Sequence, residues 1–278
     1  MKTAPDLALA FVFHWFSELR FWRCSALECV EAGTALIQSG SGSFYERKLG
    51  MKIALENIAP RDIERRSFEI ITQELGDTPL IPGTEPIVKR CIHTSADFDY
   101  AQNLRFTPGA VEQGLAAIRA GAVILTDTQM GRSGVNKQVL ERFGGRAECY
   151  MTDPDVAEAA RTGGTTRAVA SMDKAARTLT DAPLIVAVGN APTALIRLSE
   201  QMEQDVHFRP ALIVGVPVGF VNVVESKELI WHTCARLGVP CIAAMGRKGG
   251  SNVAAAICNA LLYLASGRTP MPKAKETP

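Results

Sequence analysis

The sequence predicts an α/β protein, a single domain with a mostly parallel sheet flanked by helices on both faces. Short apolar runs and amphipathic segments alternate between residues 122 and 265, in the order that produces βαβ crossovers. The runs contain few polar residues, which is typical of parallel strands covered by helices on both faces. A chain of 278 residues is also long enough to bury a substantial core. We therefore expect a Rossmann-like, doubly wound architecture.

Three helices are predicted before the alternating region begins. The first starts at Pro60, because proline suits the first turn of a helix, and Glu85 with the proline after it opens a second helix that runs towards His93. In the third, Thr107 is the expected N-cap, with proline at the first helical position and Gly121 at the end. The residues expected on the apolar face of the first helix are Ile63, Phe68, Ile71 and Leu75.

The alternating region then supplies the strands of the predicted sheet. The runs expected to form strands are residues 122–127, 147–151, 183–188, 211–216 and 241–245. Helices are expected around 137–143, after Asp153 and the proline that follows it, and over 165–179, 191–202, 224–237 and 252–265. Because helices separate the successive strands, the strands should run parallel and end at one edge of the sheet.

Polar and glycine-rich segments follow four of these strands, and they are the main functional signal. The segments cover residues 125–130, 189–195, 215–228 and 246–252. Ligands in open α/β sheets bind where strand ends and helix N-termini gather, so four such loops predict one shared site. Within the third segment, Glu225 and Lys227 are interpreted either as an ion pair or as ligand contacts. A fifth segment, residues 90–100, places His93 among polar side chains.

The composition excludes several classes of protein. With 30 basic and 29 acidic residues, no global field favours nucleic acid or an anionic membrane. No apolar stretch approaches the ~20 residues that span a bilayer, and no secretory cleavage pattern follows the apolar run at 7–16, so we expect a cytoplasmic protein. Seven cysteines argue against a disulfide framework, and Cys24 with Cys29 lacks the second pair of a zinc site. The cysteines expected in the core are Cys91, Cys241 and Cys258.

The two ends of the chain differ in character from the middle. Residues 1–50 contain two of the three tryptophans and a Gly-Ser tract, and they lack a clear period. We interpret them as an N-terminal extension, which is either an extra helix with a linker or a stretch that precedes a natural start at Met51. Residues 51–267 then form the functional domain. The Pro- and Lys-rich residues 268–278 are expected to be a flexible tail.

No common cofactor, metal or nucleophile motif occurs in the chain. It has no G-x-G-x-x-G after a strand, no G-x-x-x-x-G-K-[ST], no G-x-S-x-G and no H-E-x-x-H, so we expect neither a cofactor nor a metal site. The turn at 246–251 offers backbone N–H groups and two cations to a phosphate or a carboxylate. His93, with an ordinary pKa near ~6.5, is the strongest candidate for proton chemistry. Many donors and few nucleophiles suit an isomerase or a binder of a polyanion.

Several segments resemble the precorrin-8X methylmutases of cobalamin biosynthesis. The matching stretches are IERRSF at 63–68, KRCIHTSADFDYA at 89–101, TDTQM at 126–130, GNAPTAL at 189–195, PVGFV at 217–221, ESKE at 225–228 and GRKGGSNVAAAICNALL at 246–262. Together they extend over nearly all of residues 57–265, and most are unrelated to any general cofactor motif, so the match is specific. The segments around His93 and at 246–252 are most similar to the branch that acts on cobalt-precorrin-8.

The resemblance implies a reaction and roles for individual residues. It implies an isomerase that moves a methyl group from C-11 to C-12 of cobalt-precorrin-8 or precorrin-8X, giving cobyrinic or hydrogenobyrinic acid, with no cofactor. His93 is implied to protonate or hydrogen-bond a ring nitrogen, and Asp127 to order the loops. The implied contacts to the carboxylate-rich tetrapyrrole are Arg66, Ser67, Thr94, Arg167, Asn190, Thr193, Ser226, Arg247, Lys248 and Ser251. The family forms homodimers, and the apolar helix at 253–264 fits an interface or a core.

Two other functions remain open on the sequence. One is a corrinoid-binding carrier without turnover, and the other is a phosphate-binding α/β enzyme that uses the turn at 246–251. The absence of a nucleotide fingerprint weighs against the second. A carrier would bind a coloured corrinoid without changing its isomer composition, whereas a phosphate-binding protein would stay colourless and lose its ligand to inorganic phosphate.

Overall fold

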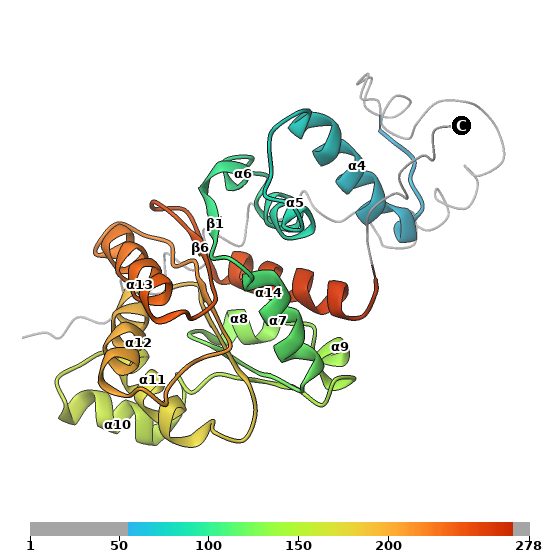
Figure 1. The fold of residues 1–278 in the computed structure, drawn as a ribbon. Helices are drawn as coiled ribbons and strands as arrows, with labels where there is room; N and C mark the ends of the chain where they lie inside the picture. The colour runs from blue at the N-terminus through green and yellow to red at the C-terminus, as the bar shows by residue number, and fades with distance from the viewer. Residues whose placement is uncertain (1–54, 269–278) are drawn as a thin grey trace, which may run out of the picture. The chain divides into compact units, whose positions relative to one another are not determined.

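A six-stranded sheet with the strand order β1-β6-β5-β4-β2-β3 forms the centre of the computed structural model, which describes residues 55–268 (Figure 1). The strands are β1 (Leu104–Phe106), β2 (Val123–Thr126), β3 (Arg146–Glu148), β4 (Leu184–Val188), β5 (Leu212–Gly215) and β6 (Cys241–Ala244). β1 runs antiparallel to β6, and the other neighbouring strands are parallel. The mostly parallel sheet predicted from the sequence is therefore confirmed.

Helices flank this sheet on both faces. Those within the described residues are η2 (Pro60–Asp62, a 3-10 helix), α4 (Ile63–Leu75), α5 (Glu85–Ser95), α6 (Tyr100–Asn103), α7 (Ala110–Arg119), α8 (Gln129–Gly134), α9 (Lys137–Glu141), α10 (Pro154–Thr162), α11 (Arg167–Thr178), α12 (Pro192–Gln204), α13 (Val223–Leu237) and α14 (Ser251–Ala265). α5, α7 and α14 lie on one face of the sheet, and α11, α12 and α13 lie on the other (Figure 1). The side chains of each group form the core on their face. The predicted N-terminal extension and nearly all of the predicted tail lie outside the described residues.

The central strand β4 shows why the strands contain so few polar residues. All five of its residues are buried. Ile185 and Ala187 join the core formed with α5, α7 and α14, whereas Val186 and Val188 join the core formed with α11, α12 and α13. Successive side chains of a strand point to opposite faces, so a strand that helices cover on both faces must be apolar throughout.

The apolar helix α14 belongs to the core. Most residues from Val253 to Leu262 are buried, and the helix packs against α5, α7 and α8. Like every other helix within residues 55–268, it is not long and apolar enough to cross a membrane. Cys91, Cys241 and Cys258 are buried free thiols, as predicted.

The predicted N-cap at Thr107 is wrong. Helix α7 begins later, at Ala110, after Gly109 in the left-handed conformation with φ of 74°. Thr107 instead continues the pairing of β1 with β6, because its N–H donates to the carbonyl of Cys241 at 2.9 Å. Its hydroxyl oxygen also accepts the N–H of Cys241 at 2.8 Å. Thr107 therefore extends the pairing of β1 with β6, and the proline after it lies before the helix begins.

Three of the short elements have no counterpart in the sequence-based prediction. β1, α6 and α8 have three, four and six residues, which is too short to show a period. α8 also contains Gly134, where a Cβ would lie only 2.8 Å from the Cβ of Ala255, so the glycine allows close packing on α14. The strand predicted over 147–151 is shorter than expected, because β3 ends at Glu148.

Candidate active site

The candidate site lies at the carboxyl edge of the sheet, where the chain leaves the neighbouring strands β2 and β4 towards opposite faces. α8 follows β2 and packs against α14, whereas α12 follows β4 and contributes to the other core. Open α/β sheets bind ligands at such a topological switch point. The loops after β5 and β6 reach the same edge, because these strands are parallel to β4. The structure thus brings together the four loops that the sequence analysis assigned to one site.

Asp127, directly after β2, connects the first two loops. Its carboxylate accepts hydrogen bonds from the backbone N–H groups of Gly189, Asn190 and Ala191, at 2.8, 2.8 and 2.7 Å. The residue is only 1 % exposed. Burial raises the pKa of this carboxyl, and the three N–H donors oppose the rise. These contacts agree with the loop-ordering role expected for Asp127.

The loops after β4, β5 and β6 also contact one another closely. The N–H of Gly250 donates to the carbonyl of Val216 at 2.9 Å. A Cβ at Gly249 would lie 2.1 Å from the same carbonyl oxygen, so only glycine permits this approach. Ser251, the first residue of α14, shares a hydrogen bond of 2.7 Å with the hydroxyl of Thr128. Ser251 therefore fastens the start of α14 to the loop after β2.

His93 lies near the end of α5 and is held from α4. Its Nδ1 is 2.9 Å from the hydroxyl of Ser67, and its ring stacks on Phe68 with 5.4 Å between the ring centroids. Within residues 55–268, Nε2 has no hydrogen-bond partner. Burial lowers the pKa of His93, the Arg90 guanidinium lowers it further, and Glu64 opposes the shift. The free imidazole is therefore mainly neutral at pH 7, with Nε2 available to a ligand.

Arg90 is the cation that accompanies this histidine, and its position is fixed. Its Nη2 pairs with Glu64 at 2.8 Å. The guanidinium lies over the rings of Phe68 and Tyr263, 5.2 and 4.7 Å from their centroids. Two aromatic faces and one carboxylate thus hold a buried cation beside His93. Sequence analysis did not select Arg90 as a site residue, although it lies three residues before His93.

A cavity of about 220 Å³ opens beside His93. Its lining consists of Arg90, His93, Thr94, Gly134, Asn252, Ala255, Ala256 and Asn259. Whole small ligands usually occupy pockets of about 300–1,000 Å³, so this cavity suits one edge of a larger ligand. Sequence analysis missed Asn252 and Asn259. Their seven-residue spacing, which places both on one face of a helix, is the signal that could have found them.

An ion pair joins the His93 segment to the strand-end loops. Lys248, in the turn after β6, pairs with Asp97 at 2.7 Å and also with Asp99, and both acids follow α5 in the chain. The hydrogen bonds to Asp97 and Asp99 raise the pKa of Lys248, and the bond from Lys248 lowers the pKa of Asp97. The ammonium of Lys248 is therefore already paired within the protein.

Two predicted arginines lie exposed along the same edge. The guanidinium of Arg247 is 5.4 Å from the ring centroid of Phe220. Arg167 is the first residue of α11, and its neighbour Thr166 shares a 2.9 Å hydrogen bond with Thr193 near the start of α12. These arginines and the adjoining helix N-termini can receive the carboxylates of a ligand.

Other predicted residues are engaged inside the protein. Ser226 is 1 % exposed, and its hydroxyl donates to the carbonyl of Val223 at 3.0 Å. Lys227 is fully buried, and its ammonium donates to backbone carbonyls, so the interpretation of Lys227 as part of a surface ion pair is wrong. Arg66 lies on α4 with its Nη1 3.7 Å from a carboxylate oxygen of Glu69.

Exposed apolar side chains accompany these polar groups. Val218, Phe220 and Val221, in the loop after β5, are 47, 82 and 78 % exposed, and Met130 on α8 is 69 % exposed. Large apolar side chains that remain in water at a strand-end site favour a ligand with an apolar surface of its own. The loop after β5 therefore presents an apolar surface at this edge.

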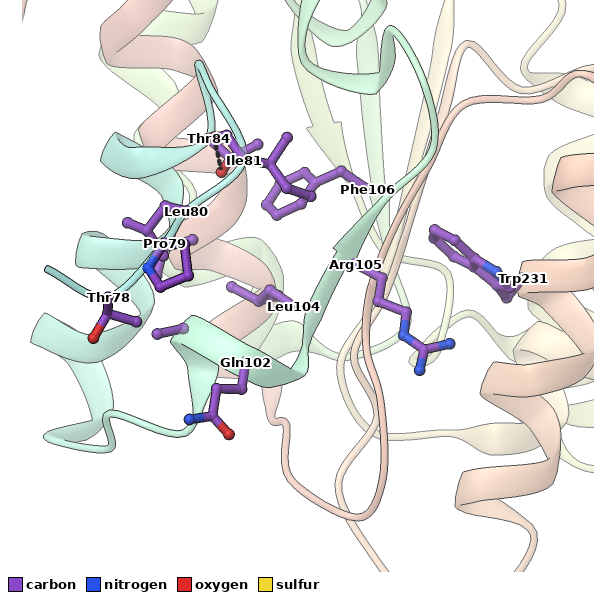
Figure 2. Close-up of a pocket in the computed structure, with 12 residues that line it drawn as sticks. Thr78, Pro79, Leu80, Ile81, Thr84, Gln102, Leu104, Arg105, Phe106 and Trp231 are labelled. Carbon is purple, nitrogen blue, oxygen red and sulfur yellow. Dashed lines mark hydrogen bonds between the residues drawn. The ribbon is translucent and has the colours of Figure 1, made fainter. Parts of the chain in front are cut away.

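A second cavity, of about 550 Å³, lies beside the edge strand β1 (Figure 2). Leu80, Leu104 and Phe106 form apolar parts of its lining, and Arg105 and Trp231 border it on the other side of the strand. None of its lining residues is histidine, cysteine or a carboxylate, so it offers no acid–base group. Within residues 55–268, no group of three or more His, Cys, Asp or Glu side chains could hold a metal ion.

The family model for precorrin-8X methylmutase matches residues 62–264. The cobalt-precorrin-8 methylmutase of Priestia megaterium is 45 % identical over 221 residues, which cover 79 % of this chain and 95 % of the relative. The enzyme of the same name from Salmonella typhimurium is 47 % identical over 209 residues, covering 73 % and 95 %. The precorrin-8X methylmutase of Pseudomonas aeruginosa is 39 % identical over 199 residues, covering 72 % and 93 %.

A solved structure from the same family is also similar to this chain. The precorrin-8X methylmutase of Thermus thermophilus superimposes with a TM-score of 0.67 at 43 % sequence identity. The superposition covers 74 % of this chain and 98 % of the Thermus chain. The similarity therefore extends over nearly the whole length of these relatives.

We predict that Asp127→Ala destabilises the protein by about 3–5 kcal/mol, because it leaves three buried N–H groups without an acceptor. The free energy of unfolding in urea measures this change. The control is Asp181→Ala, which removes an exposed partner of Arg146 and should leave the unfolding midpoint unchanged. Equal, small effects of the two substitutions would contradict the role assigned to Asp127.

We also predict that the pKa of His93 lies below its ordinary value of ~6.5 and falls further in Glu64→Gln, because that substitution removes the carboxylate that raises it. A pH titration of the imidazole signals by NMR, assigned with His93→Asn, tests both shifts. A His93 pKa above the ordinary value, or a rise in Glu64→Gln, would show that the site electrostatics are not as described.

Proposed function

Because the chain belongs to the precorrin-8X methylmutase family, we propose that it moves a methyl group from C-11 to C-12 of a precorrin-8 tetrapyrrole in cobalamin biosynthesis. The product would be cobyrinic acid from the cobalt ring or hydrogenobyrinic acid from the metal-free ring. The observation that carries the proposal is the placement of His93. Ser67 holds one ring nitrogen, and the other is available at a cavity that adjoins the strand-end loops.

In this proposal His93 donates a hydrogen bond from Nε2 to a ring nitrogen near the migrating methyl group. A hydroxyl that donates to Nδ1 favours the tautomer with its proton on Nε2, and the lowered pKa keeps the free ring mainly neutral. Withdrawing electron density from the tetrapyrrole lowers the barrier to a sigmatropic shift, and acid–base assistance typically gives ~10²–10⁴-fold. Such a shift needs no nucleophile.

The carboxylates of the substrate would be held by the exposed arginines at the edge. Arg247 and Arg167 have the planar donor geometry that binds carboxylates with two hydrogen bonds. Thr94 and Asn252 supply neutral contacts inside the His93 cavity. Lys248 acts differently in this proposal, because its pairs with Asp97 and Asp99 use its charge to fix the His93 segment.

The remaining predicted contacts divide by exposure. The side chains of Asn190 and Thr193 at the strand-end loops are not buried, and neither are those of Arg66 and Ser67 on α4. These four residues remain proposed contacts. Ser226 and Ser251 are buried, and their hydroxyls are used in bonds to Val223 and Thr128. We therefore assign these two serines to the support of the site.

The relatives favour the cobalt ring as the preferred substrate. The two most similar relatives described above, at 45 and 47 % identity, carry the name cobalt-precorrin-8 methylmutase, and the relative named precorrin-8X methylmutase is 39 % identical. The cobalt ion would enter as part of the substrate. The homodimer and the cytoplasmic location stay predictions.

Purified protein should convert cobalt-precorrin-8 faster than precorrin-8X under anaerobic conditions. We expect His93→Ala to lower kcat by ~10²–10⁴-fold, because it removes the donor to the ring. Absorbance and chromatographic retention measure conversion, since the isomers share one mass. His232→Ala, which changes an exposed histidine on α13, is the matched control and should keep the wild-type rate.

Each alternative function has its own outcome in this assay. Faster conversion of the metal-free ring would keep the methylmutase activity and reverse the choice of branch. Tight binding without conversion of either ring would exclude the enzyme and favour a corrinoid carrier. A ligand displaced by inorganic phosphate would favour a phosphate-binding enzyme.

The pH dependence separates a neutral donor from a charged acid. Because the pKa of His93 is lowered, the imidazole is neutral at pH 7 and becomes charged only as the pH falls through that lowered value. For a neutral donor, kcat/KM should not increase as the pH falls from about 8 through that lowered pKa, because the neutral ring and the imidazolium both carry the Nε2–H. Initial rates of the wild-type protein measure the profile. An increase of kcat/KM with falling pH would instead assign the reaction to the imidazolium.

A further inference from the structure

Lys227 is a buried cation that the proposed chemistry does not use. It lies on α13, it has no exposed surface, and its Nζ donates to the carbonyls of Gly246 and Lys248, both at 2.8 Å. Within residues 55–268, no carboxylate contacts this ammonium. Burying a charge without an opposite charge is costly, so an apolar side chain would serve a purely structural purpose better.

The two hydrogen bonds fix the orientation of the turn after β6. A trans peptide is planar, with its C=O and the following N–H pointing in opposite directions. The carbonyls of Gly246 and Lys248 point to Lys227, so the N–H groups of Arg247 and Gly249 point away from it. Neither N–H has an acceptor within residues 55–268.

The peptide between them is also fixed. The carbonyl of Arg247 accepts the N–H of Gly219 at 3.2 Å, and the N–H of Gly250 donates to Val216 at 2.9 Å. Every carbonyl from Gly246 to Lys248 thus has a donor inside the protein. The turn presents N–H groups and the exposed Arg247 side chain on its outer side, which is the arrangement that binds an anion.

We propose that Lys227 is a positioning residue for anion recognition: by holding the carbonyls of Gly246 and Lys248, it directs the turn's N–H groups and Arg247 towards a carboxylate of the substrate. The choice of a tetrapyrrole carboxylate rests on the proposed function. Lys227 does not touch the substrate itself. Its positive charge also adds to the potential that the outer side of the turn offers to an anion.

The lowered pKa of Lys227 agrees with this arrangement. Burial lowers it to about 8, and no neighbouring carboxylate compensates. The ammonium remains the main form at pH 7, where it can donate to both carbonyls at once. An apolar residue at this position would leave both carbonyls without a donor and allow the turn to reorient.

The test compares Lys227→Met, which keeps an unbranched side chain one atom shorter and removes its charge, with the wild-type protein. We expect KM for the tetrapyrrole to rise about ten- to hundredfold, the effect of losing one or two charge-assisted contacts, while kcat changes less than about threefold. Lys227→Arg, which keeps a cation and its donors, should recover part of the loss. Lys89→Met, a change at another buried lysine, should lower thermal stability without raising KM.

A second measurement needs no substrate. Hydrogen exchange of the amides of Gly219 and Gly250, which bond the turn to the loop after β5, should be at least about tenfold faster in Lys227→Met. Amides of β4 should exchange at wild-type rates. If Lys227→Met does not fold, Lys227→Gln takes its place in both measurements.

The outcomes separate this inference from the proposed function. If the wild-type protein binds the tetrapyrrole without converting it, the enzyme proposal fails, and the Kd of the tetrapyrrole replaces KM in the comparison. A weaker Kd with faster exchange then still supports the role of Lys227. An unchanged KM or Kd in Lys227→Met, or a loss no different from that of Lys89→Met, would overturn it.

Discussion

The carboxylate of Asp127, surrounded by three backbone N–H groups, is the interaction on which the site depends. β2 and β4 are neighbours, but their chains leave the sheet towards opposite faces, and this divergence opens the crevice. A buried carboxylate at the end of one strand fixes the loop of the other. The remaining loops then pack at distances that exclude side chains, as at Gly249 against Val216. The site is therefore built largely from backbone contacts.

Asp127 and Lys227 both hold the backbone of a loop through a buried charge, negative in Asp127 and positive in Lys227. The carboxylate collects N–H groups from the loop after β4, and the ammonium collects carbonyls from the turn after β6. Within residues 55–268 no opposite charge contacts either group, and backbone dipoles compensate each charge. The exposed Arg247 and Arg167 are thereby left for a ligand. In the proposed function, these arginines provide a local anion site in a protein whose net charge is almost balanced.

His93, the candidate for proton chemistry, lies on α5 and not on the strand-end loops. The ion pair of Lys248 connects its segment to these loops. His93 is placed by α4 and α5, and burial, together with the fixed neighbour Arg90, lowers the pKa of its imidazole. Lys248 joins this segment to the turn through Asp97 and Asp99. This ion pair is a direct contact between the turn after β6 and the segment that carries His93.

The sequence by itself determined the alternation of the longer strands and helices, because apolar runs and helical periods are local signals. It also gave His93 and the four loops, since their motifs follow predicted strands. Local signals failed where a distant partner decided the outcome. Thr107 has the sequence of an N-cap, but Cys241, 134 residues away, uses its hydroxyl. Lys227 lies beside acidic residues in the sequence and therefore resembles a surface lysine. The folded chain instead buries it under the turn after β6. Only the tertiary structure decides burial and long-range hydrogen bonds, because both depend on which segments the folded chain brings into contact.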